Sequence, residues 1–350
     1  MKFPSFCGTL IAVAFAAAAV YAGDTTTNSA SPAAVAPTTT NASPTRTKDN
    51  IEFTIGPVYA DAPELTAHPD VPEGALFDFI MNSEDSKCYP GIAKNQTGTV
   101  PYQRKVCVYV PRQYVPGTPA PFIVAQDGLG YRKTLPRILD NMIHDHRLPA
   151  LVAIMINSGG GDAQGSERGL EYDTVSGRYA LFIETEVLPK IEHDYKVTFS
   201  KNPEARATMG GSSGGAAAFT MAWFHPELYH RVLTYSGTYV NQQSPPNASS
   251  PHGAWEYHER LIPQGEAKPL RVWLEVSEHD IGANREEASF HNWVMANQRM
   301  AAVLKAKGYQ YRYVFAEGAK HTDGRVTRQT LPGALEWLWQ GYKAQGSVAK

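Results

Sequence analysis

Residues 207–219 read Ala-Thr-Met-Gly-Gly-Ser-Ser-Gly-Gly-Ala-Ala-Ala-Phe, which predicts a short strand, a tight turn and a helix of small residues. Within this stretch, Gly210 to Gly214 fill the pattern Gly-x-Ser-x-Gly, which is typical of a nucleophile elbow. In such an elbow the serine, here Ser212, has a strained backbone and its hydroxyl projects above the sheet. Glycines flank the serine because a Cβ would collide with the neighbouring strand or helix. The stretch therefore predicts a nucleophilic serine.

Two other interpretations of this stretch have to be weighed. The run Gly-Gly-Ser-Ser-Gly-Gly is also typical of a flexible linker, but a linker is not followed at once by an apolar helical run such as residues 216–224. The pattern also fits one residue later, over Gly211 to Gly215, which would make Ser213 the nucleophile. The residues alone leave this register open.

The composition is that of a globular protein with little net charge. The chain has 350 residues, of which 43% are hydrophobic, and its formal net charge is -2. This length accommodates one large domain or two ordinary ones. The near-neutral charge argues against nucleic acid as the main partner.

The N-terminus has the features of a secretory signal peptide, which we place at residues 1–22. Lys2 gives a positive start, Leu10 to Val20 form an apolar run too short to cross a bilayer comfortably, and Ala22 ends a small-residue cleavage site. Residues 23–50 are rich in Thr, Ser, Ala and Pro and predict a disordered spacer. We expect a periplasmic or secreted protein without stable membrane insertion after cleavage, and a folded domain over residues 51–345.

The cysteines agree with export. Cys7 would leave with the signal peptide, so that Cys88 and Cys107 remain as a pair in a chain destined for an oxidising compartment. We expect a disulfide between them. The alternative is two separate buried thiols.

Apolar runs and helical periodicities alternate along the rest of the chain. Short apolar runs predict strands at 77–80, 106–110, 121–126, 151–156, 206–209, 231–236, 270–276 and 309–315. Helical periodicity predicts helices at 135–144, 179–194, 216–224, 292–307 and 331–342. The alternation predicts an α/β fold in a single domain, with a mostly parallel central sheet and helices on both faces.

Polar loops follow the strands that come after Ser212, at the sheet edge where active groups gather in such folds. An elbow serine is followed along the chain by an acid and then by a histidine. The strand over 270–276 is followed by Glu278 and Asp280, and the last strand is followed by His321. His321 can take the serine proton as general base, and Asp280 can orient its imidazole. We favour Asp280 as the acid, and Glu278 is the alternative.

Other parts of the cleft are expected around this trio. One oxyanion donor would be the backbone N–H of Ser213, and the other would come from Leu129 or Gly128 in the turn after the strand 121–126. The alternative for this turn is an ordinary tight turn without a role. Trp293, close behind the acid loop, is a candidate substrate-binding side chain. Residues 241–255, rich in Pro, Ser and Asn, are a candidate lid or substrate loop.

Together these motifs resemble the esterase family that includes enterochelin esterases, feruloyl and acetylxylan esterases, esterase D and mycolyltransferases, an α/β-hydrolase family. The resemblance extends over residues 107–342. It is carried by the Asp127-Gly128 turn, Arg168 with Glu171-Tyr172, Leu188-Pro189, Gly210 to Gly215, Ser236-Gly237, Asn297-Gln298-Arg299, and Gly318 to His321. The likeness implies Ser212 as the nucleophile, because a doubled glycine commonly follows the elbow in this family, with His321 as base and Asp280 as acid. It also makes Arg168 a candidate substrate-binding residue.

The chain departs from the family's pattern at two points, since Lys320 precedes the base where a glycine is usual, and Ser277 stands where a glycine usually precedes the acid. The resemblance and the signal peptide imply an exported serine esterase that works through an acyl-enzyme on feruloyl- or acetyl-type esters of carbohydrate. The alternatives are a trilactone siderophore esterase, an acyltransferase of the mycolyltransferase kind, and a non-catalytic binding domain. The expected partner is a small-molecule or carbohydrate ester, without a metal or an organic cofactor.

Overall fold

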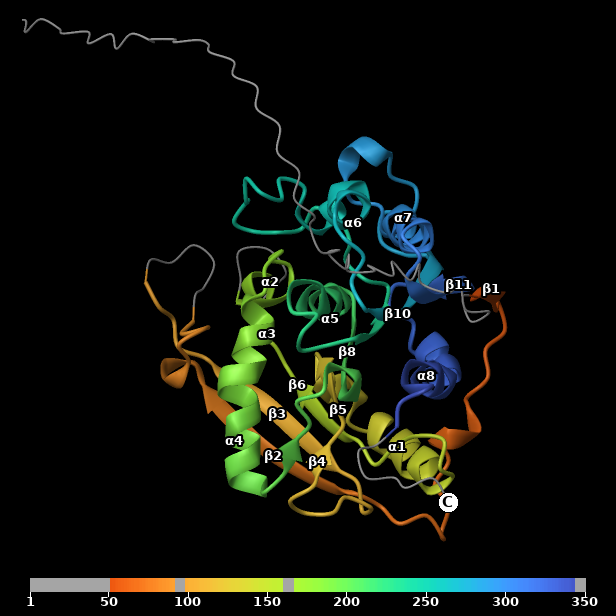
Figure 1. The fold of residues 1–350 in the computed structure, drawn as a ribbon. Coiled ribbons are helices and arrows are strands. Elements are labelled where there is room, and N and C mark those ends of the chain that lie inside the picture. The colour runs from red at the N-terminus through yellow and green to blue at the C-terminus, as the bar shows by residue number, and fades with distance from the viewer. Residues whose placement is uncertain (1–50, 92–97, 160–166, 344–350) are drawn as a thin grey trace, which may run out of the picture. The chain divides into compact units, whose positions relative to one another are not determined.

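The computed structural model describes residues 51–91, 98–159 and 167–343 (Figure 1). All of them belong to one compact unit, Pro44–Lys350. The predicted signal peptide (1–22) and spacer (23–50) lie outside the described residues, and the first described strand begins at Ile51. No helix in the described ranges combines the length and the apolar character that crossing a bilayer requires.

A nine-stranded sheet forms the centre of the described residues. Its order is β1-β11-β10-β9-β8-β5-β6-β3-β2, and β3 runs antiparallel to both of its neighbours while the other pairs are parallel. The strands are β1 (Ile51–Ile55), β2 (Ala75–Asn82), β3 (Gln103–Val110), β5 (Phe122–Gln126), β6 (Val152–Ile156), β8 (Arg206–Gly211), β9 (Arg231–Tyr235), β10 (Arg271–His279) and β11 (Gln310–Lys320). A separate parallel pair joins β4 (Pro119–Ala120) to β7 (Thr198–Phe199). The predicted, mostly parallel sheet is confirmed.

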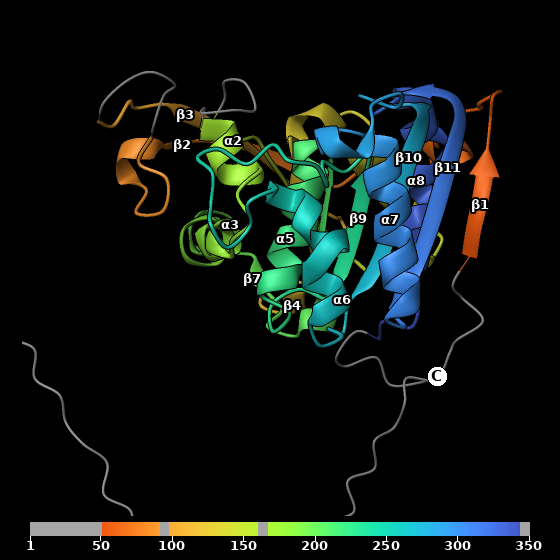
Figure 2. The ribbon, with the colours of Figure 1, turned by 90° about the horizontal axis from the view of Figure 1, so that it is seen from above.

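Helices cover both faces of the sheet (Figures 1 and 2). One face carries α1 (Leu135–His144) and α8 (Gly324–Trp339), and the other carries α3 (Arg178–Phe182), α4 (Leu188–Tyr195), α5 (Ser213–Phe224) and α7 (Trp293–Ala306). The shorter α2 (Glu167–Tyr172) and α6 (Ile262–Gln264) lie on the side of α5. Alternate residues of the central strands enter the two cores, as when Val124 packs beneath α5 and Ile123 beneath α1.

Short 3-10 and π-helical turns connect these elements. The 3-10 turns are Pro63–Leu65, Ser83–Asp85, Gly128–Tyr131, Pro203–Ala205, Gly253–Trp255 and Glu287–Ser289, and the π turns are Ile183–Val187 and Tyr257–Leu261. The helix predicted over 179–194 is thus α3, a π turn and α4 in direct succession. Pro189 comes just after the π turn, and it lacks the N–H that an uninterrupted α-helix would use at this position.

Three predicted elements are longer than the sequence indicates. β10 continues past Val276 to His279, β11 continues past Phe315 to Lys320, and α8 begins at Gly324 instead of residue 331. The added residues are largely polar, so that apolar runs did not mark them. Both strand extensions lie at the edge of the sheet where Asp280 and His321 follow.

The disulfide predicted between Cys88 and Cys107 is wrong for this structure, in which both are free thiols. Cys107 on β3 is buried in the core beneath α1, whereas Cys88 packs against the core on the opposite face of the sheet. Because the sheet separates the two sulfur atoms, they cannot meet in disulfide geometry. Burial raises the pKa of each thiol to about 11, so both remain protonated at neutral pH.

Candidate active site

Ser212 occupies the turn between β8 and α5. Its φ of 56° and ψ of -129° lie outside the ordinary regions for an L-residue, a conformation that costs about 1–3 kcal/mol and persists only where the surroundings enforce it. The enforcement is visible at Gly210, where an added Cβ would lie 2.5 Å from the backbone carbon of Gly214. Strand and helix therefore approach each other more closely than any side chain allows, and the serine at the bend projects from the sheet edge.

His321 and Asp280 follow the ends of two neighbouring strands. His279 on β10 pairs in register with Lys320 on β11, so the next residue of each strand emerges at the same point. His321 Nε2 lies 2.8 Å from Ser212 Oγ, and His321 Nδ1 lies 2.5 Å from Asp280 Oδ1. The three side chains form one hydrogen-bonded line from the hydroxyl through the imidazole to the carboxylate.

The carboxylate of Asp280 is withdrawn from solvent. Its side chain is fully buried, and the N–H of Ile281 donates to Oδ1 at 2.7 Å, while Oδ2 has no hydrogen-bond partner among the described residues. The imidazole of His321 is 22% exposed. A buried acid and a partly exposed base are what proton transfer at a protein surface requires.

The two alternatives left open by the sequence, Ser213 and Glu278, make other contacts. Ser213 is fully buried, and its Oγ accepts a hydrogen bond from Gln242 Nε2 at 3.3 Å. Glu278 is exposed, and its Oε2 accepts from the N–H of Gly318 at 2.7 Å. The line of hydrogen bonds therefore includes Ser212 and Asp280, and neither rival.

The predicted oxyanion donors belong to two elements. Ser213 is the first residue of α5, where helix N–H groups have no intrahelical acceptor. The turn Gly128–Tyr131 follows β5 as expected, but the N–H of Leu129 donates to Asn157 Oδ1 at 3.2 Å. An added Cβ at Gly128 would lie 2.4 Å from the Met155 backbone, so this turn needs its glycine to approach β6.

A cavity of about 470 Å³ opens onto Ser212. Its lining comes from the turn after β5, α2, the elbow and the start of α8: Asp127, Gly130, Tyr131, Thr134, Arg168, Gly211, Ser212, Tyr235, Thr322, Gly324, Thr327 and Arg328. Arg168 thus lies where the sequence placed it, with Nη2 2.8 Å from Asp127 Oδ2. Residues 241–255 contribute no lining residue, so the predicted lid lies outside the wall of this cavity.

Trp293 is in the site but not in the cavity wall. It is 3% exposed, and its ring stands at 85° to the His321 imidazole with the centroids 6.1 Å apart. Its Nε1 donates to Thr238 Oγ1 at 3.2 Å, and that oxygen lies 3.3 Å from Ser212 Oγ. Trp293 therefore packs against the imidazole and hydrogen-bonds to Thr238. Its ring is not exposed for the predicted contact with substrate.

Sequence reasoning missed several residues of this site, including Thr238, Asn157 and Arg328. Asn157 directly follows β6, so its position at the active edge of the sheet was a usable signal. Thr238 follows β9 by three residues in the same way. Arg328 lies on the part of α8 that helical periodicity did not mark, and its guanidinium pairs with Asp61.

Potential metal ligands gather at one place in the described residues, away from Ser212. Ligand atoms of His252, Glu256 and Glu259 lie within 4.8 Å of one another. Arg260 Nε, however, donates to the buried Glu256 carboxylate at 3.0 Å. Because this carboxylate is already neutralised by a cation, ion pairing accounts for the cluster.

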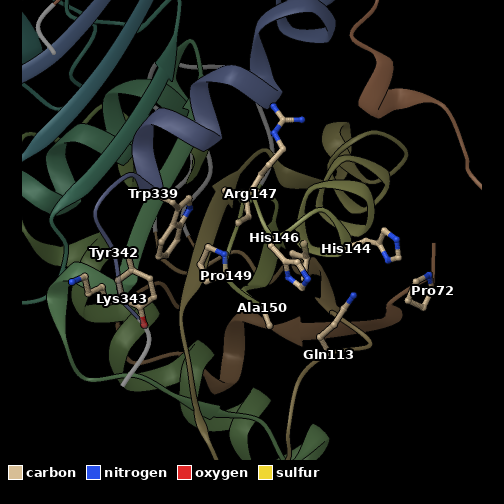
Figure 3. A pocket seen from close by; sticks show the side chains of 12 residues that line it. Pro72, Gln113, His144, His146, Arg147, Pro149, Ala150, Trp339, Tyr342 and Lys343 are labelled. Atoms are coloured by element: carbon tan, nitrogen blue, oxygen red, sulfur yellow. The ribbon is translucent and has the colours of Figure 1, made fainter. Parts of the chain in front are cut away.

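A second hollow of about 760 Å³ lies where α1 ends and β6 begins (Figure 3). Its labelled walls carry His144, His146, Arg147, Trp339, Tyr342 and Lys343. It adjoins the starts of the parallel strands, whereas groups for catalysis in such sheets lie at their carboxyl ends. The cavity at Ser212 is therefore the candidate active site.

The arrangement at Ser212 suits nucleophilic attack on an acyl carbon. A hydroxyl within 2.8 Å of an imidazole can be deprotonated as it attacks, and the carboxylate on the far nitrogen stabilises the imidazolium that forms. Backbone N–H groups at a helix N-terminus suit the negative charge that develops on the carbonyl oxygen.

The comparison with protein families agrees with this chemistry. The family model described as "Putative esterase" matches residues 97–338, which is more than half of the chain. The chain belongs to this esterase family. No curated protein sequence matches this chain.

Solved structures establish the fold of this chain. The enterobactin esterase FES from Shigella flexneri is 21% identical with a TM-score of 0.54, and the match covers 78% of this chain and 60% of that chain. A ferulic acid esterase is 15% identical with a TM-score of 0.54, covering 76% of this chain and 99% of that chain. A feruloyl esterase module from Clostridium thermocellum in complex with sinapinate is 16% identical with a TM-score of 0.51. That match covers 84% of this chain and 95% of that chain.

At these identities the likeness extends to the fold alone. It is the α/β-hydrolase fold that the sequence predicted, and this chain spans 60% of the length of the Shigella enzyme.

Proposed function

We propose that the protein is a serine carboxylic-ester hydrolase that works through an acyl-enzyme. Ser212 is the nucleophile, His321 the general base and acid, and Asp280 the group that orients the imidazole. The observation that carries this proposal is the continuous hydrogen-bonded line from Ser212 Oγ through His321 to Asp280. Family membership supports the ester as substrate.

The reaction has two balanced halves. Ser212 Oγ attacks the acyl carbon while His321 Nε2 takes its proton, and the tetrahedral adduct collapses when His321 returns that proton to the leaving alcohol. Water then attacks the acyl-serine with the same base, and the carboxylic acid leaves. The N–H of Ser213 and a donor from the turn at Leu129 hold the oxyanion in both halves, and Leu129 must give up its bond to Asn157 to do so.

We propose feruloyl- or acetyl-type esters of carbohydrate as substrates and the periplasm or the cell exterior as the location. The match to a ferulic acid esterase extends over 99% of that chain, whereas only 60% of the enterobactin esterase is matched, which favours the first class over a siderophore trilactone. The apolar run and cleavage site in residues 1–22 support export.

The test is turnover of p-nitrophenyl acetate and methyl ferulate by the purified protein, with an acetylated xylan and enterobactin as further substrates. Ser212→Ala is expected to lower kcat by about 10⁴-fold or more, because the attacking atom is removed. Mass spectrometry of the enzyme quenched during turnover should find the acyl group on the peptide containing Ser212. A Ser212→Ala protein that keeps its activity, with the loss appearing in Ser213→Ala, would reassign the nucleophile.

A further inference from the structure

A buried carboxyl group without a role in the proposed mechanism lies behind the elbow. Asp173 follows α2 directly and is 3% exposed. Its Oδ1 has no hydrogen-bond partner among the described residues. A carboxyl group in such a place is costly to bury, so its position calls for a local purpose.

The contacts of Asp173 lead to the residue after the nucleophile. The Ser213 hydroxyl interacts with the Asp173 carboxyl and acts to lower its pKa. Gln242 Nε2 lies 3.4 Å from Asp173 Oδ2 and 3.3 Å from Ser213 Oγ, so one amide reaches both groups. Gln243, the next residue, accepts a hydrogen bond from the N–H of Val175 at 2.7 Å. Two adjacent glutamines thus attach the loop 241–255 to the segment that carries Asp173.

The position of Ser213 matters because its backbone N–H is the oxyanion donor of the proposed reaction. This N–H stabilises the transition state only if it points at the developing charge before reaction. Even a small displacement of such a donor lowers the rate strongly. Contacts to the Ser213 side chain can fix the position of the first turn of α5. Among the described residues, Asp173 and Gln242 alone hold the Ser213 hydroxyl.

We propose that Asp173 is a positioning residue that, together with Gln242, holds Ser213 so that its backbone N–H is pre-aimed at the oxyanion. The loop 241–255 then contributes to catalysis by supporting the elbow from behind and not by covering the cavity. This inference rests on the proposed esterase function and extends it to two residues outside the cavity wall.

The charge state of Asp173 allows a conservative replacement. Burial raises the pKa of Asp173 to about 7, and the bonds from Ser213 and Gln242 and the charge of Arg168 act in the opposite direction, while Asp127 adds to the rise. Near neutral pH a large share of the group is therefore uncharged. Asparagine keeps the size and an acceptor oxygen for Ser213 and Gln242 without a charge, so it should replace Asp173 with little loss.

The experiment compares Asp173→Ala, Asp173→Asn and Gln242→Ala in hydrolysis of p-nitrophenyl acetate. Asp173→Ala is expected to lower kcat by about tenfold or more with KM within about twofold, since a transition-state contact is misplaced while substrate binding remains. Asp173→Asn should keep kcat within about threefold, and Gln242→Ala should lower kcat to an intermediate value. The affinity for an aryl trifluoromethyl ketone, which forms an oxyanion adduct on the serine, should fall in step with kcat.

Asp140→Ala is the matched control. Asp140 is another buried carboxyl, which accepts from the N–H of Gly74 and from the Tyr109 hydroxyl at 2.8 Å each, on the α1 face of the sheet. Its loss should lower Tm and leave kcat unchanged. An Asp173→Ala protein with unchanged kcat overturns the proposal, and so does an Asp173→Asn protein as impaired as Asp173→Ala. If Asp173→Ala does not fold, an unchanged kcat in Gln242→Ala decides against it. An inactive wild-type protein would refute the proposed function and this inference together.

Discussion

Adjacent residues of the elbow have opposite environments. The hydroxyl of Ser212 meets an imidazole at the cavity, and the hydroxyl of Ser213 meets an amide behind the sheet edge. The same contrast separates Asp280, which is buried against His321, from Glu278, which is exposed and bonded to a backbone N–H. Roles at this scale depend on the direction in which a side chain leaves the turn.

The two carboxylates give a direct test of the acid. Asp280→Asn is expected to lower kcat by about 10³-fold or more, because an amide cannot stabilise the imidazolium and favours the wrong tautomer of His321. Glu278→Gln is the control and should leave kcat unchanged. The measurement is steady-state hydrolysis of p-nitrophenyl acetate by both variants. Loss of activity in Glu278→Gln alone would transfer the acid's role to that residue.

Glu275 on β10 predicts a pH dependence of stability. Burial raises its pKa from 4.5 to about 8, and Ser277 Oγ donates to its Oε1 at 3.0 Å. Between these two pH values the folded protein binds one proton more than the unfolded chain, so rising pH favours unfolding, with a slope of about 1.4 kcal/mol per pH unit. Below pH 4.5 both states hold the proton, and above pH 8 the penalty is complete.

Glu275→Gln should remove this slope, since an amide does not titrate and can still accept from Ser277. Urea unfolding from pH 4 to pH 9 would show the unfolding free energy of the variant rising relative to that of the wild type between pH 4.5 and about pH 8. Above that pH the difference between the two proteins should stay constant. Parallel curves over the whole range would mean that Glu275 is ionised when folded.

Sequence reasoning reached the hydrogen-bonded line but not its surroundings. Chain order and strand ends selected His321 and favoured Asp280 over Glu278, because those rules concern the backbone. The choice of Ser212 over Ser213 came from the family resemblance. They do not specify partners of side chains. The Leu129 N–H donates to Asn157, and the buried Trp293 ring packs perpendicular to the His321 ring. Both facts depend on packing between distant segments.

The elements are placed by strand length as much as by strand order. β10 and β11 must extend to His279 and Lys320 for the acid and base to emerge together, and the polar residues that complete them carry no apolar pattern. Helix α8 begins early for a comparable reason, since Asp323 caps it through the N–H of Arg325. The sequence predicted the existence of these elements, whereas the tertiary pairing determined where they end.

The junction of β8 and α5 predicts which glycine is indispensable. Gly210→Ala places a Cβ 2.5 Å from the Gly214 backbone, and neither element can yield without moving Ser212. We expect a loss of stability of about 3 kcal/mol and a large loss of kcat. Gly333→Ala, on the exposed side of α8 where a Cβ meets nothing within 4 Å, is the control and should stabilise by about 1 kcal/mol. Thermal unfolding and steady-state kcat of both variants test this. Equal Tm and kcat values for Gly210→Ala and Gly333→Ala would contradict it.

At the scale of the molecule, the sheet joins sequence-distant segments. β1, near the start of the described residues, pairs in parallel with β11, the last strand. The sequence predicted the alternation of strands and helices and the resulting fold class. It did not predict β1, because the five residues Ile51–Ile55 are mostly exposed and lack the apolar continuity of the central strands.

The edge strand defines a test of the N-terminal boundary. A chain of residues 51–350 is expected to keep the kcat and Tm of the full chain, since the described fold begins with β1. A chain beginning at Pro57 is the matched comparison and should have a lower Tm, because it leaves the backbone of β11 unpaired on one side. In cells, the full chain should be processed to begin at Gly23, and N-terminal sequencing of the exported protein would show this. Retention of an unprocessed chain in the cytoplasm would contradict the signal peptide.

The direction of β1 has a practical consequence. Ile51 pairs with Arg312 and Ile55 with Ala316, so the strand enters the sheet at the border far from His321 and advances toward it. A protein of residues 51–350 that is attached to a bead or a carrier through Ile51 would consequently have the opening at Ser212 on the side away from the attachment point. A bulky polymer could then reach the serine without passing the anchor.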